Sequence, residues 1–145
     1  MKRLISARAV SIVLSVTLLS LSCGCSKSVD TAVVKGQVMM DGKPLDGVMV
    51  YFMPDPEKGT EGGMSTCVTD SDGRFVMKYG WEGSEEGAAI GWHRVTLEDF
   101  VSENYRGSGK PPAPRVPRNY MDPSKTPLKV EVKEGEQDIV LEVEE

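Results

Sequence analysis

Few side chains of this sequence have the types and spacing that catalysis needs. The chain contains a single histidine, His93, so a serine or cysteine nucleophile would have to use it as a base, and no Gly-x-Ser-x-Gly motif is present. A zinc site normally uses more ligands than His93 and the distant Cys67 supply. We therefore predict that His93 is a packed, hydrogen-bonded residue and that Cys67 is a small apolar residue. The protein is predicted not to be an enzyme and to bind no cofactor.

Two loops begin like ligand-binding motifs but do not complete them. Residues 70–73, Asp-Ser-Asp-Gly, start like a calcium loop, yet Arg74 stands at the fifth position and Trp81 at the twelfth, where an EF-hand needs a glutamate. The alternative that stays open there is a weak surface calcium site. Residues 107–110, Gly-Ser-Gly-Lys, lack the earlier glycine of a phosphate loop, and a proline follows the lysine in place of Ser or Thr.

The two tryptophans are the candidate contacts for a ligand or partner. Trp92 falls on the strand face opposite His93, where water is expected. A tryptophan in such a place stacks on a sugar ring or anchors a protein partner. Trp81 is the other candidate. The alternative, that each tryptophan covers an edge of the core, stays open.

The first residues have the composition of an export signal. Lys2, Arg3 and Arg8 form a basic start, residues 9–21 are mainly apolar, and small residues follow. A membrane-spanning helix needs about 20 apolar residues, so this shorter segment fits a secretory signal better than a permanent anchor. The formal net charge is −5, and removing these three positive charges leaves −8 on the remainder. An acidic surface argues against nucleic acid as a partner.

The end of this signal resembles the lipobox of bacterial lipoproteins, in which small residues precede a cysteine that receives diacylglycerol. Gly24 precedes Cys25, which we favour as the lipid-attachment residue, and Ser22 precedes Cys23, which is the alternative. Several acyl chains, palmitate among them, hold such a protein firmly in a membrane. The other interpretation is an ordinary secretory signal with two incidental cysteines.

This resemblance implies a domain boundary and a location. Residues 1–24 form the signal peptide, and residues 25–32 form the lipidated N-terminus and linker. The lipid then holds the protein to the extracytoplasmic side of a membrane of the cell envelope. Ser26 is not the aspartate that retains some lipoproteins at an inner membrane, so an outer-membrane position is preferred.

Residues 33–145 form the predicted folded domain, which is all-β. Apolar and polar residues alternate, turn residues such as Asp-Gly separate the runs, and no helical periodicity is sustained. Residues 134–136 are expected to link the last two strands, and each sheet is expected to have one wet face. The pattern predicts a seven-stranded antiparallel β-sandwich with strands at residues 33–40, 47–54, 64–69, 73–79, 89–98, 128–133 and 138–143.

Residues 101–127 form one long loop that is rich in proline and glycine. Proline does not fit in central strands, and loops of this length are usually functional or disordered. We expect residues 103–115 to be mobile and to act as a spacer or as a binding loop. The part that follows is expected to be ordered because Val116, Tyr120 and Met121 cover the edge of the core.

Three stretches carry a resemblance to a known family. They are Val-Lys-Gly-Gln-Val at residues 34–38, Asp-Gly-Lys-Pro-Leu-Asp-Gly-Val-Met-Val at 41–50 and Thr-Asp-Ser-Asp-Gly-Arg-Phe at 69–75. These stretches are similar to the motifs of the carboxypeptidase regulatory-like domain, a transthyretin-like (prealbumin-type) sandwich of seven strands. Residues 117–138 resemble small lipoproteins of planctomycete-type bacteria. The resemblance implies a fold and is nearly silent on activity.

One further match is excluded. Residues 105–108, Tyr-Arg-Gly-Ser, match the tetrapeptide that ends the transthyretin-related hydroxyisourate hydrolases, which also use two histidines and an arginine. Here the tetrapeptide is internal and the histidine is single. We expect instead a non-catalytic lipoprotein that binds an envelope protein or glycan, or that supports the envelope structurally. The alternative is an accessory subunit of a membrane-bound hydrolase or transporter, and the oligomeric state is left open.

Overall fold

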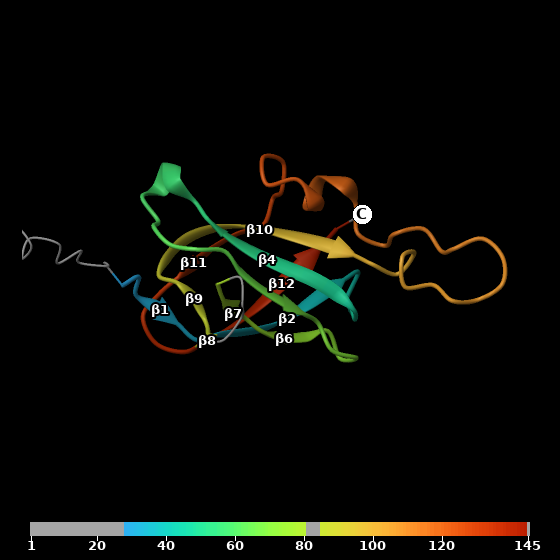
Figure 1. Ribbon diagram of the computed structural model, residues 1–145, viewed down its shortest axis with the longest axis horizontal. Helices are drawn as coiled ribbons and strands as arrows, with labels where there is room; N and C mark the ends of the chain where they lie inside the picture. Colours follow the sequence, from blue (N-terminus) through green and yellow to red (C-terminus); the bar gives the residue numbers. More distant parts are fainter. Residues whose placement is uncertain (1–27, 81–84, 145) are drawn as a thin grey trace, which may run out of the picture.

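The computed structural model describes residues 28–80 and 85–144, which form an all-β fold (Figure 1). The predicted all-β class is therefore confirmed. The predicted signal peptide, Cys23, Cys25 and Trp81 lie outside the described residues. No helix in the described part of the chain is long and apolar enough to cross a membrane.

The elements, including the 3-10 helices η1 and η2, are β1 (Thr31–Ala32), β2 (Val34–Met40), β3 (Lys43–Pro44), β4 (Val48–Pro54), η1 (Pro56–Lys58), β5 (Ser65–Val68), β6 (Arg74–Val76), β7 (Lys78–Tyr79), β8 (Glu85–Glu86), β9 (Ala88–Ala89), β10 (Gly91–Asp99), η2 (Arg118–Met121), β11 (Lys129–Val132) and β12 (Gln137–Val143).

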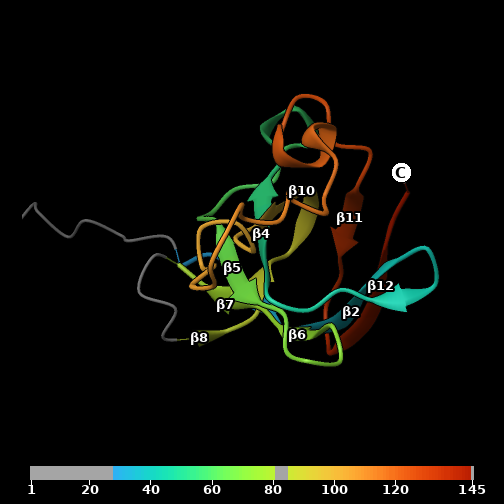
Figure 2. The ribbon, with the colours of Figure 1, turned by 90° about the vertical axis from the view of Figure 1, so that its right-hand side faces the viewer.

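Two main sheets contribute to one core. The larger sheet has the strand order β11-β10-β4-β5-β7-β8, and the smaller has the order β12-β2-β3, with β6 also paired to β2 (Figure 2). β1 and β9 pair with each other separately. The inner faces of the two main sheets share one buried apolar cluster, which includes Val34, Val38, Leu141 and Val143 from the smaller sheet and Val50, Phe52, Val95 and Leu97 from the larger.

The period-two patterns correctly predict which side chains point inward. Val48, Val50 and Phe52 of β4 are fully buried, and so are Val95 and Leu97 of the neighbouring antiparallel strand β10. Burying an apolar side chain of this size stabilises a fold by about 1.5–3 kcal/mol. These two strands therefore form the centre of the core, and they fix the positions of the residues on their outer faces.

The single strand predicted at residues 73–79 is wrong, because this segment crosses from one sheet to the other. β6 pairs with β2 in the smaller sheet, whereas β7 pairs with β5 in the larger. Met77 lies between them, is fully buried, and donates its N–H to the Val34 carbonyl at 2.9 Å. Strands that switch sheets in this way close the corners between packed sheets.

The predicted antiparallel arrangement is also wrong for one pair of strands. β11 pairs antiparallel with β10, whereas β12 pairs parallel with β2, with Gln137 opposite Val34 and Val143 opposite Met40. Gly135, with φ of 91°, turns the chain from one sheet to the other instead of closing a hairpin. Each of the two strands carries an inward apolar row, and this arrangement lets each row complete a different sheet.

Residues 116–127, which we call the strap, lie over β10 (Figure 1). Val116 and Tyr120 are buried as predicted, and the Tyr120 hydroxyl accepts a hydrogen bond from the Glu144 N–H at 3.0 Å. Thr126 donates its hydroxyl to the Val95 carbonyl at 2.6 Å. The prediction for Met121 is wrong, since its side chain is 41% exposed. Successive side chains of a 3-10 turn point about 120° apart, so burying Tyr120 turns its neighbour outward.

Candidate functional site

His93 is buried in β10, in agreement with the sequence prediction. Its Nδ1 lies 3.0 Å from the Gly91 carbonyl oxygen, which places the ring proton on that nitrogen, and its ring packs against Phe52 with 5.6 Å between centroids. Nε2 has no hydrogen-bond partner among the described residues. A general base needs its free nitrogen within reach of the reacting group, so this placement supports a packing role for His93.

The burial of His93 predicts a pH dependence of stability. Burial lowers the pKa of His93 below 6.5, and the bond to the Gly91 carbonyl opposes this only in part. The unfolded chain binds a proton below that pH while the folded protein keeps the ring neutral. The free energy of unfolding should therefore fall by at most about 1.4 kcal/mol per pH unit between pH ~7 and ~5. Urea unfolding should show this slope in the wild type and lose it in His93→Phe, and equal slopes would contradict the assignment.

Cys67 and the loop at residues 70–73 serve packing and turn formation. Cys67 is half-buried, its Sγ lies 3.2 Å from the Met77 Sδ, and burial raises the pKa of the thiol to about 12. The nucleophilic thiolate is therefore scarce at neutral pH. Asp70 accepts the N–H groups of Asp72 and Arg74 on Oδ1, each at 2.9 Å. Within residues 28–80 and 85–144, no three His, Cys, Asp or Glu side chains are grouped to hold a metal ion.

Trp92 is the one predicted contact residue that falls in the described part of the chain. It lies on the outer face of β10, is 38% exposed, and stands opposite Glu131 of β11. Arg94, on the same face of β10, donates from Nη2 to Asp55 at 3.0 Å and to Glu57 at 2.7 Å. The indole is thus an aromatic platform with charged, hydrogen-bonding neighbours.

An ion-pair cluster that sequence reasoning missed closes the base of the long loop; we call it the Arg115 clamp (Asp46, Asp99 and Arg115). Arg115 donates to Asp99 Oδ2 from its backbone N–H at 2.7 Å and from Nε at 3.0 Å, and to Oδ1 from Nη2 at 3.0 Å. Its Nη1 reaches Asp46 at 2.9 Å. Burial alone would raise the pKa of Asp99, but the hydrogen bonds from Arg115 outweigh it and lower that pKa.

The clamp holds residues 103–114, which we call the projecting loop. The loop extends away from the sheets in Figure 1, and residues 106–114 are all exposed. The prediction that the mobile segment includes Arg115 is wrong, because this residue is the anchor. Each of residues 110–114 is a proline or precedes one, and both conditions favour the polyproline II conformation. The segment is therefore stiff by its covalent structure, although it makes no strand.

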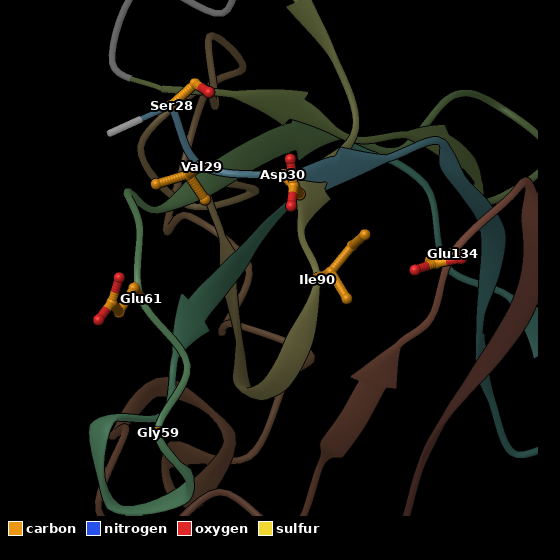
Figure 3. A pocket seen from close by; sticks show the side chains of 7 residues that line it. All are labelled: Ser28, Val29, Asp30, Gly59, Glu61, Ile90 and Glu134. Atoms are coloured by element: carbon orange, nitrogen blue, oxygen red, sulfur yellow. The ribbon is translucent and has the colours of Figure 1, made fainter. Parts of the chain in front are cut away.

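A cavity of about 380 Å³ opens beside β1, at the end of the domain away from the projecting loop. Figure 3 shows its lining residues, among them the carboxylates of Asp30, Glu61 and Glu134 and the side chain of Ile90. These carboxylates come from three separate segments and do not form a metal-binding group. The cavity gives this end of the domain an acidic wall and no evident catalytic arrangement.

Comparisons with the models of protein families, with curated proteins and with solved structures found no match to this chain. The resemblance to the carboxypeptidase regulatory-like domain therefore stays a prediction from the motifs.

Proposed function

We propose that this protein is a lipid-anchored, non-catalytic binding module of a bacterial cell envelope, built on a transthyretin-like sandwich of the carboxypeptidase regulatory-like kind. The observation that carries the proposal is the position of two features along the long axis. In Figure 1, β1, which follows the predicted anchor, lies at one end, and the projecting loop lies at the other. A tether at one end and an exposed loop at the other suit a module that presents the loop away from a membrane.

The linker length supports this orientation. The chain from Cys25 to Thr31 covers at most about 22 Å when fully extended. A lipid on Cys25 would keep the β1 end of the domain within that distance of the membrane surface, and the projecting loop would face the opposite way. The same orientation holds for attachment at Cys23.

The motif residues support the sandwich assignment. Gly47 and Gly73 have positive φ values of 64° and 69°, which glycine adopts most readily. A Cβ at Gly73 would lie 2.7 Å from the Val38 carbonyl oxygen, so this motif glycine is also needed for close packing. The apolar clusters of the two main sheets meet in one core, as a sandwich requires.

The projecting loop is the proposed contact for a protein partner. Residues 106–114 are exposed, and polyproline II segments bind aromatic-lined grooves at a low cost in conformational entropy. Arg106 and Lys110 add positive charge to a protein whose net charge is −5. The partner that fits is therefore an envelope protein with an aromatic groove and acidic residues at its rim. The same contact would serve an accessory subunit of a membrane-bound hydrolase or transporter, which is the alternative function.

Site-specific cross-linking tests this contact. A photoreactive amino acid placed at Ala113 in the native host should give one discrete adduct from membranes, and replacing Pro111, Pro112 and Pro114 with alanine should remove it. The matched control position is the exposed Glu134, at the tether end. Equal adducts at both positions, or an adduct that survives the proline replacements, would contradict a role for the projecting loop.

A glycan ligand on the Trp92 face is the second candidate function. An indole that is 38% exposed between charged groups is suited to stack on a sugar ring. Sedimentation with purified, insoluble cell-wall glycan should then be lost in Trp92→Ala and kept in the proline variant. If the glycan retains both variants, the Trp92 face is not the glycan-binding surface.

A further inference from the structure

The outer face of β4 is apolar where a wet sheet face is expected. Val48, Val50 and Phe52 fill the inner face, and the alternate residues Met49, Tyr51 and Met53 point to the other side. Antiparallel sheets that face water on one side usually carry polar residues there. The strap covers part of this face but leaves a space beside it. The core accounts for the inner apolar residues of β4 but not for the outer ones, so another feature of the fold must account for those.

A cavity of about 300 Å³ lies on this outer face, between the larger sheet and the strap. Three methionines from three separate segments line it: Met53 from β4, Met64 just before β5, and Met121 from η2. The remaining lining residues are Tyr51, Thr96, Leu97, Glu98 and Pro123. The fold thus gathers three thioether groups around one small space.

Thioethers have a distinctive ligand chemistry. Their sulfur is uncharged and soft, so it prefers soft monovalent ions such as Cu(I), whereas hard divalent ions prefer oxygen ligands. A thioether also needs no deprotonation before it binds. The described residues hold no competing group of three His, Cys, Asp or Glu side chains.

The charge of the cavity matches one positive charge. Glu98 supplies a carboxylate, which accepts a hydrogen bond from the Tyr51 hydroxyl at 2.9 Å. Three neutral thioethers and one carboxylate therefore balance a monovalent cation.

We propose that Met53, Met64 and Met121 form a binding site for a soft monovalent metal ion of the Cu(I) type on the outer face of β4. This site is independent of the proposed contact at the projecting loop. Met121, which is 41% exposed, gives the ion a route from solvent. The sequence predicted that Met121 covers the edge of the core. Its exposed side chain is suited instead to a metal ligand at the mouth of the cavity.

Silver(I) is the probe, because it is soft and monovalent and is not oxidised by air. The detergent-solubilised chain is titrated in halide-free buffer, with Cys67 and whichever of Cys23 and Cys25 carries no lipid replaced by alanine, so that no thiol competes for silver. The test variant replaces Met53, Met64 and Met121 with leucine, which conserves volume. The control variant replaces Met39, Met40 and Met49 with leucine; none of these lines the cavity. We expect the test variant to lose one equivalent of bound silver that the control keeps.

Methionine methyl NMR decides the question without any methionine variant. Silver should shift the ε-methyl signals of Met53, Met64 and Met121 and leave those of Met39 and Met40 in place. Silver binding by the test variant equal to that of the control would overturn the proposal. So would equal shifts of all methionine signals, or no binding at all.

Discussion

Arg115→Ala is expected to lower the free energy of unfolding by about 3 kcal/mol, because it leaves a buried carboxylate without its cation. The Asp99 side chain is 1% exposed, and it accepts hydrogen bonds from Nε and Nη2 of Arg115, each at 3.0 Å. Arg115→Lys should recover only part of the loss, since an ammonium lacks the planar fork of donors. Urea unfolding at neutral pH gives the free energies of unfolding of the wild type, Arg115→Ala and Arg115→Lys, which are then compared.

Lys35→Ala is the matched control for this experiment. It removes an ion pair with Glu136 at 2.7 Å, but both partners are exposed. Such exposed pairs add little to stability, because water screens the charges and two long side chains lose conformational freedom. If Arg115→Ala costs no more than Lys35→Ala, the clamp does not hold the projecting loop to the domain in the way described.

Gly36→Ala is expected to destabilise the fold by about 3 kcal/mol or to prevent folding, because it overpacks the smaller sheet. Gly36 lies in β2 between two neighbours, opposite Ile139 of β12 on one side and Phe75 of β6 on the other. A Cβ there would overlap the Ile139 carbonyl oxygen and would lie 2.7 Å from Phe75 Cζ. The crowding arises directly from the parallel pairing of β12 with β2.

Gly63→Ala is the control, since it adds the same methyl group where there is room. Its nearest neighbour would be the Tyr79 hydroxyl oxygen at 3.7 Å, an ordinary contact. We expect a change within about 0.5 kcal/mol, as for most surface substitutions. Thermal unfolding of the two variants should differ clearly, and equal stability would contradict the parallel pairing of β2 and β12.

The inward residues of the strands are predictable from the sequence because alternation is a local property. Val48, Val50 and Phe52 are one example, and Val95 and Leu97 are another. Sheet membership is not local. Glycine at residue 135 predicts a turn but does not say whether the chain closes a hairpin or crosses to the other sheet. Only the packing of both apolar rows decides that, so the parallel partner of β12 was missed.

The candidate functional surfaces also differ in whether the sequence alone predicts them. Trp92 was predictable because a strand has two faces and His93 occupies the inner one. The Arg115 clamp was not, since Asp46 lies far away in the sequence and charged residues in loops are usually solvated. The sequence contains one indication of the methionine cavity, which is that residues 48–53 are apolar on both faces of the strand. That signal says that the outer face is covered, but the covering residues come from the distant strap.

Mass spectrometry of the N-terminal peptide from native membranes tests the central claim most directly. The proposed function predicts a mature chain that begins at Cys25, or at Cys23, and carries the mass of diacylglycerol and an additional acyl chain. A chain that begins elsewhere and carries no lipid would contradict the anchor. The tether would then be absent, and the position of the projecting loop relative to a membrane would no longer support the proposal.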